Sequence, residues 1–210
     1  GKFVGVCRTD WLQFDRAQGN SRRLPPCRSF SSPPVREIGA VSYDRLQIQR
    51  TIREAEGYLE LGMTAHALVS LQRRGKLVHG NARACYLLGE TLRELRRYRE
   101  AIIPLERSAD LMPDDIHTWL ALAWCYKRAN RLNDAIEALE QALAVDPSEA
   151  ILHYNLACYW SLARNRVLAL SYLSHAIEID GNFRDLAHDE PDFYPLRHDP
   201  GFQLLAGAIV

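Results

Sequence analysis

The histidine and cysteine side chains, which could act as bases, nucleophiles or metal ligands, are scattered through the 210-residue chain. No H-E-x-x-H or C-x-x-C spacing occurs, and no glycine-rich loop could hold a phosphate group. His153 and Cys158 share one predicted helix, but residues five apart lie about 140° around a helical axis, so the two side chains diverge. The sequence therefore predicts no catalytic site, no metal site and no cofactor, and we expect the protein not to be an enzyme.

The cysteines form an odd and widely spaced set, which is not typical of a disulfide framework. They are Cys7, Cys27, Cys85, Cys125 and Cys158. We interpret the last three as small packing residues and expect a reducing, cytoplasmic location. The longest nearly apolar stretch, 116–126, is shorter than the roughly 20 apolar residues of a membrane-spanning helix, so no membrane span is predicted.

The formal net charge is zero, but it is divided unevenly along the chain. Residues 1–40 contain seven basic and three acidic residues, a net charge of +4, so the remaining 170 residues carry −4. The first 40 residues are rich in Arg, Pro and Ser and lack a sustained hydrophobic period, which predicts a disordered or extended basic head. Three explanations for it remain open: a tail that binds an anionic partner, an organellar transit segment, or sequence translated upstream of a start at Val41. We favour the third.

The rest of the chain follows a 34-residue repeat. Alanine recurs at this interval, with leucine four residues later and a small residue twelve residues earlier. The three columns are Ala67, Ala101, Ala135, Ala169; Leu71, Leu105, Leu139, Leu173; and Ala55, Gly89, Ala123, Ala157. Each period splits into two amphipathic halves joined by a short polar turn, which predicts antiparallel helix pairs. The small residue would let the two helices of a pair approach closely.

The third unit carries a specific resemblance. Its motif Trp119-x-x-Leu122-Ala123-x-x-Tyr126, followed by Ala135, Leu139, Ala142 and Pro147, resembles the tetratricopeptide repeat at its signature positions. The resemblance implies an all-α fold, a right-handed α-solenoid of antiparallel helix pairs. It covers residues 41–182 as four units, at about 48–81, 82–115, 116–149 and 150–183. The first unit is the weakest match, with Glu54 and Arg74 at positions that are usually apolar or small.

The last residues, 183–210, break the period with three prolines. Within them, 192–202 resembles the segment that follows the last repeat in many bacterial tetratricopeptide proteins. Because the last helix pair of a solenoid exposes an apolar face, we expect a C-terminal capping segment here.

In this family the first helices of the units line a concave groove, so the resemblance implies a binding site for a peptide or helix of a partner. The residues that we expect to face this groove are Ile52, Glu56, Arg83, Tyr86, Glu90, Leu120, Trp124, Lys127, Tyr154 and Asn155. We expect Tyr86, Leu120, Trp124 and Tyr154 to be anchors, since Trp124 lies five residues beyond Trp119 and cannot share its helical stripe. The alternative is that these side chains pack on adjacent first helices or on the chain's own tail.

The predicted function is that of a non-catalytic adaptor or scaffold with a protein or peptide partner. The alternative class is an RNA-binding helical-repeat protein, but the net charge of −4 after residue 40 argues against contact with phosphate, so no nucleic acid is expected. A cluster of bases is interpreted as a solvated helix end and turn; it consists of Arg93, Arg96, Arg97 and Arg99. The exposed ends of such a solenoid also allow self-association.

Overall fold

A computed structural model describes the backbone of residues 35–207 and the side chains of residues 43–207. Helices make up its regular structure, and no strand occurs within that range. They are α2 (Val35–Glu60), α3 (Thr64–Gln72), α4 (Gly75–His79), α5 (Ala82–Glu94), α6 (Tyr98–Leu111), α7 (Ile116–Arg128), α8 (Leu132–Val145), α9 (Ala150–Leu162), α10 (Arg166–Ile179), α11 (Phe183–Asp189), the 3₁₀ helix η1 (Pro191–Leu196) and α12 (Pro200–Leu205).

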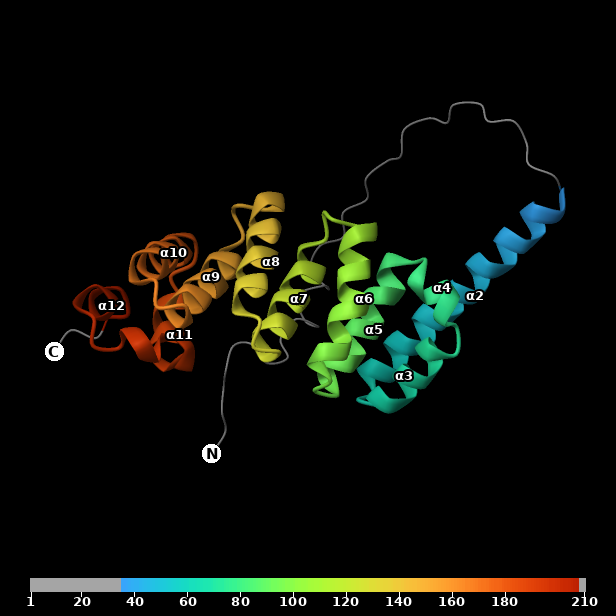
Figure 1. Ribbon diagram of the computed structural model, residues 1–210, viewed down its shortest axis with the longest axis horizontal. Coiled ribbons are helices and arrows are strands. Elements are labelled where there is room, and N and C mark those ends of the chain that lie inside the picture. Colours follow the sequence, from blue (N-terminus) through green and yellow to red (C-terminus); the bar gives the residue numbers. More distant parts are fainter. Residues whose placement is uncertain (1–34, 208–210) are drawn as a thin grey trace, which may run out of the picture.

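The helices form consecutive pairs stacked along one axis (Figure 1). The paired helices are α2 with α3, α5 with α6, α7 with α8, and α9 with α10. The short helix α4 is inserted between α3 and α5, so the first pair is followed by a turn unlike the others. The predicted all-α solenoid is therefore confirmed.

The first helix begins at Val35, upstream of the expected boundary at Val41, and Ser42 lies inside it. Residues 35–40 of the predicted basic head thus belong to helix α2, and the rest of that head lies outside the described residues.

The repeating small residue permits the close contact inside each pair. A Cβ atom added at Gly89 of α5 would lie 2.4 Å from Cγ of Leu105 on α6, so glycine leaves the room that the leucine fills. At the equivalent positions Ala55, Ala123 and Ala157 are fully buried. The steric reason predicted for this column is therefore observed directly in the second pair.

The turns inside the pairs repeat with the same period. Four residues spaced by 34 have φ values between 59° and 70°, in the left-handed region; they are Gly62, Arg96, Asn130 and Arg164. After each of them, a backbone N–H donates to the carbonyl five residues back, at 2.7–2.9 Å. These bonds run from Met63 to Tyr58, Arg97 to Leu92, Arg131 to Tyr126 and Asn165 to Trp160. This is the Schellman ending of a helix, and it fixes the angle at which each second helix returns.

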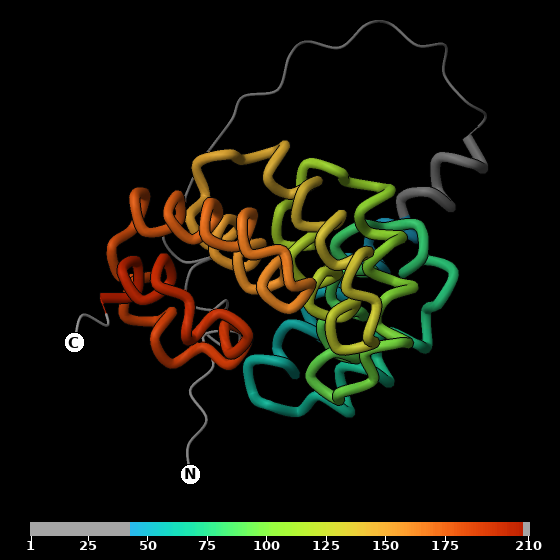
Figure 2. Tube along the Cα trace, turned by 60° about the vertical axis from the view of Figure 1, so that its left-hand side comes forward, coloured from blue at the N-terminus to red at the C-terminus, as the bar shows by residue number. Residues whose placement is uncertain are grey.

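The C-terminal elements α11, η1 and α12 pack on the last pair, at one end of the row in both views (Figures 1 and 2). Phe193 of η1 is 0% exposed, and its ring centroid lies 5.8 Å from that of Tyr154 on α9 and 5.2 Å from that of Phe202 on α12. Asp199 accepts hydrogen bonds from the first N–H groups of α12 and forms an ion pair with Arg166 of α10. Aromatic packing and this ion pair together fix the segment against α9 and α10.

Candidate binding face

The first helices of the pairs are α2, α5, α7 and α9, and we call the surface formed by their predicted groove residues the first-helix face. Side-chain contacts connect α2 to α5 through Glu56 and Arg83, and α7 to α9 through Lys127 and Tyr159. Glu90 pairs with Arg93 within α5, and Tyr154 of α9 contacts Phe193 of η1. The predicted groove residues lie on these four helices, but the structure gives them different surroundings.

Between α2 and α5, Arg83 Nη2 lies 2.9 Å from Glu56 Oε1, and both side chains are partly exposed. The guanidinium carbon of Arg83 also lies 5.4 Å from the ring centroid of Tyr86, one turn further along α5. Burial, with a contribution from the nearby Glu90, raises the pKa of Tyr86 well above its ordinary value, so the hydroxyl stays protonated. Tyr86 is therefore a half-buried aromatic side chain with a cation held over its ring.

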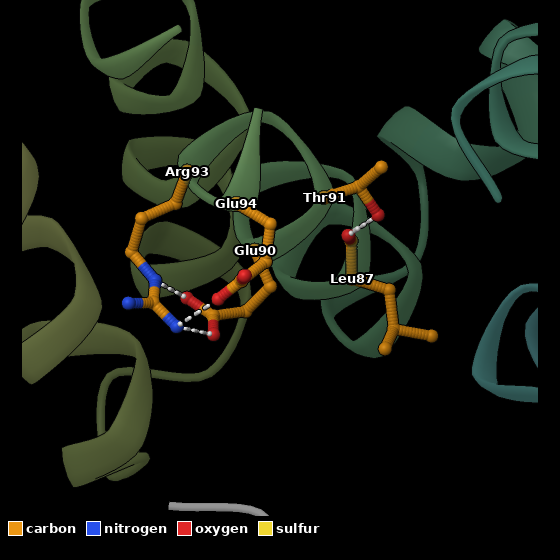
Figure 3. Close-up of polar contacts among 5 residues, drawn as sticks. All are labelled: Leu87, Glu90, Thr91, Arg93 and Glu94. Carbon is orange, nitrogen blue, oxygen red and sulfur yellow. Dashed lines mark hydrogen bonds and ion pairs between the residues drawn. The ribbon is translucent and has the colours of Figure 1, made fainter. Parts of the chain in front are cut away.

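Further along α5, Glu90 and Arg93 form a two-point ion pair (Figure 3). Arg93 Nε donates to Glu90 Oε1 at 2.8 Å, Nη2 donates to Oε2 at 2.7 Å, and Glu94 accepts from the same Nη2 at 3.2 Å. Burial alone would lower the pKa of Arg93, but the two carboxylates raise it above its ordinary value, so the guanidinium stays charged. Both partners of this pair are thus held in one geometry on α5.

Helix α7 contacts α5 and carries the buried thiol of Cys125. Burial, with a contribution from Glu90, raises the pKa of Cys125 to about 12. Burial also raises the pKa of Cys85, whose thiol donates to the carbonyl of Val78 at 3.1 Å. Both cysteines are protonated packing residues at neutral pH rather than thiolate nucleophiles.

On α7, Lys127 lies between two aromatic rings. Its Nζ atom is 5.4 Å from the ring centroid of Trp124 and 5.3 Å from that of Tyr159 on α9. The same ammonium group forms an ion pair with Asp192 of η1, and the two side chains are only 16% and 13% exposed. Lys127 therefore connects the third pair to the C-terminal segment.

On α9 the predicted groove residues are covered. Tyr154 is 1% exposed, with its ring centroid 4.7 Å from that of Phe183, and Asn155 is also buried. Ser161 Oγ donates to the backbone carbonyl of Asp192 at 2.8 Å, which holds η1 along the helix. The C-terminal segment therefore occupies the surface of α9 that the sequence assigned to a partner.

Two further groove residues, Ile52 and Leu120, are buried among neighbouring apolar side chains. The surface that stays partly exposed lies on α2, α5 and α7 and consists of Glu56, Arg83, Tyr86, Glu90, Trp124 and Lys127. Sequence reasoning missed Tyr159, Ser161 and Asp192. The sequence did indicate a terminal segment, because residues 192–202 resemble one known from this family. The spacing of residues did not indicate that this segment would lie against α9.

No group of three or more His, Cys, Asp or Glu side chains within residues 43–207 is placed to hold a metal ion. None of the helices described is long and apolar enough to cross a membrane.

A comparison with known protein families finds a match to part of the repeat region. Residues 92–157, from the end of α5 to the middle of α9, match the tetratricopeptide repeat family. This part of the chain is therefore similar to tetratricopeptide repeats, in agreement with the fold of the whole described structure.

Solved structures of other tetratricopeptide proteins have the same fold. MamA from Desulfovibrio magneticus RS-1 (residues 41 to the end) is 22% identical, with a TM-score of 0.60 over 64% of this chain and 76% of that one. YrrB, described as a tetratricopeptide protein with an unusual peptide-binding site, is 23% identical, with a TM-score of 0.60 over 64% and 69%. TTC0263, a thermophilic protein of Thermus thermophilus, is 20% identical, with a TM-score of 0.55 over 76% and 88%. At these identities the likeness concerns the fold. A comparison with curated protein sequences found no match.

Proposed function

We propose that this protein is a non-catalytic adaptor that binds an extended or helical segment of a partner protein on the part of the first-helix face formed by α2, α5 and α7. The observation that carries the proposal is the pair of half-buried aromatic side chains, Tyr86 and Trp124, each with a cation beside its ring. Such rigid aromatic side chains in a partly desolvated setting are typical anchors in protein recognition.

The ion pairs around these rings support the same proposal. Glu56 with Arg83, and Glu90 with Arg93, hold the polar side chains in place before any partner arrives. Binding would then reduce the conformational freedom of the partner segment but would cost the adaptor little conformational freedom of its own. The mixture of charges favours a partner segment with both acidic and basic residues around an apolar centre.

Tyr154 and Asn155 are left out of the proposed contact surface, because the C-terminal segment covers them. The unusual peptide-binding site described for YrrB agrees with a peptide partner here, as an analogy between similar folds. A cytoplasmic location and self-association through the solenoid ends stay predictions from the sequence.

The proposal can be tested by site-specific photo-crosslinking in cells. A photoreactive phenylalanine derivative is placed at Tyr86, at Trp124 or, as the control, at Tyr194, an aromatic residue of η1 that is 77% exposed. A partner captured from the first two sites and absent from the third is expected, and a peptide from its crosslinked region should lose binding to Trp124→Ala and Tyr86→Ala. Equal capture from all three sites, or an RNA adduct in place of a protein, would contradict the proposal.

A further inference from the structure

A second surface, away from the first-helix face, lies at the edge where α6 meets the turn between α7 and α8. It contains two adjoining hollows with volumes of about 310 Å³ and 440 Å³. The smaller one is lined by Arg96, Arg97, Tyr98, Arg99, Glu100 and Arg128. The larger one is lined by Arg99, Ile102, Ile103, Glu106, Ala129 and Arg131. Since Arg99 lines both, the hollows form one continuous surface, which we call the arginine edge.

The arginine edge is positively charged although the chain after residue 40 is acidic. Five arginines line it, and three carboxylates offset them in part. Glu100 pairs with Arg97 at 2.5 Å, Asp134 pairs with Arg131 at 2.7 Å, and the third, Glu106, accepts a hydrogen bond from a tyrosine hydroxyl. Among the described residues no carboxylate pairs with Arg96 or Arg99, so their charge is available to a ligand.

The remaining lining is apolar. Ile103 is 65% exposed and lines the larger hollow together with Arg99 and Arg131. Two aromatic rings nearby each have a cation close to them. The guanidinium carbon of Arg128 lies 5.2 Å from the ring centroid of Tyr98, and the guanidinium carbon of Arg131 lies 4.5 Å from the ring centroid of Tyr126. Each of these rings thus already has a cation on one face, which leaves less of it for stacking with a nucleobase.

From this combination we propose that the arginine edge is a second binding site, which takes an acidic segment of a protein with apolar residues among its carboxylates. The glutamates or aspartates pair with Arg96 and Arg99, and an apolar side chain of the segment covers Ile103. This site is separate from the first-helix face, so one chain can hold two segments at once.

The test uses a fluorescein-labelled peptide of glutamates with a leucine at every third position, and fluorescence anisotropy at low ionic strength. The test variant is Arg96→Asn/Arg99→Glu; asparagine is tolerated at the left-handed backbone conformation of Arg96, as Asn130 shows. The matched control is Arg50→Asn/Arg53→Glu, which makes the same change of charge at two exposed arginines of α2. Circular dichroism checks that both variants are folded.

The wild type and the control are expected to bind the peptide, and the test variant to bind it about tenfold more weakly. A peptide with serine in place of leucine should bind more weakly to the wild type, because Ile103 then gains no contact. The proposal would be overturned if the wild type did not bind the peptide, or if the test and control variants lost affinity for it equally. It would also be overturned if the wild type bound a single-stranded RNA more tightly than the peptide and the test variant lost that RNA binding.

Discussion

The two ends of the first-helix face differ in what covers them. On α2 and α5 the polar side chains pair with one another and stay partly exposed, as with Glu56 and Arg83, which are 34% and 48% exposed. On α9 the equivalent surface lies beneath η1, and the ion pair that reaches it, Lys127 with Asp192, is less than half as exposed. The same repeated architecture thus presents an open surface at one end and a surface covered by the chain's own C-terminal segment at the other. The repeat places side chains, but the neighbouring segment decides whether they are available.

The largest expected effect comes from breaking the covered end. Phe193→Ala removes a fully buried ring from its contacts with Tyr154 and Phe202, and we expect it to lower the free energy of unfolding by about 3–5 kcal/mol. The measurement is urea denaturation followed by circular dichroism. The adjacent Tyr194→Ala, which removes an exposed ring, is the control and should cost no more than about 0.5 kcal/mol. If the two variants were equally stable, the segment would not be packed on α9.

A smaller effect distinguishes the two ion pairs. Asp192→Ala leaves the ammonium of Lys127 between two rings without its carboxylate, and we expect a loss of about 1–3 kcal/mol. Glu56→Ala removes a more exposed partner, and the loss should be about 0–1 kcal/mol. Denaturation at low and at high salt measures both, and the Glu56 variant should differ less from the wild type at high salt. A larger loss for Glu56→Ala would mean that the α2 end is the more tightly built one.

The smallest effect concerns pH. Burial, with the nearby Asp192, raises the pKa of Glu190 above its ordinary value of 4.5, although Lys127 opposes the shift. The folded state therefore binds more protons than the unfolded state in the window just above pH 4.5. The contribution of this group to stability is greatest below that window and falls as the pH rises through the raised pKa.

Glu190→Gln removes this dependence. We expect its midpoint of thermal unfolding to exceed that of the wild type by an amount that grows as the pH rises from 4.5 through the raised pKa of Glu190 and then stays constant. The opposite shift at Asp199, whose pKa Arg166 lowers, is common to both proteins and cancels in the difference. A difference independent of pH would show that the carboxyl group of Glu190 has its ordinary pKa.

Much of the fold could be predicted from the sequence, since the alanine and leucine columns mark residues that the structure buries completely. The contact of Gly89 with Leu105 shows why a small residue must recur there. The surroundings of the candidate site could not be predicted from the period, because Tyr154 and Tyr86 occupy equivalent positions and differ only through a segment outside the repeat. The start of α2 at Val35 was also missed, since nothing in the period marks residues that precede it.

The packing of the C-terminal segment has a consequence for how the solenoid loses its structure. In a linear array each pair is supported only by its neighbours, so fraying begins at the less anchored end. The aromatic contacts of Phe193 and the ion pair between Arg166 and Asp199 secure the end at α9 and α10. Local opening should therefore start at the first pair, α2 and α3, and progress towards the C-terminus. This gives the chain a direction of unfolding that its nearly symmetrical repeats would not have by themselves.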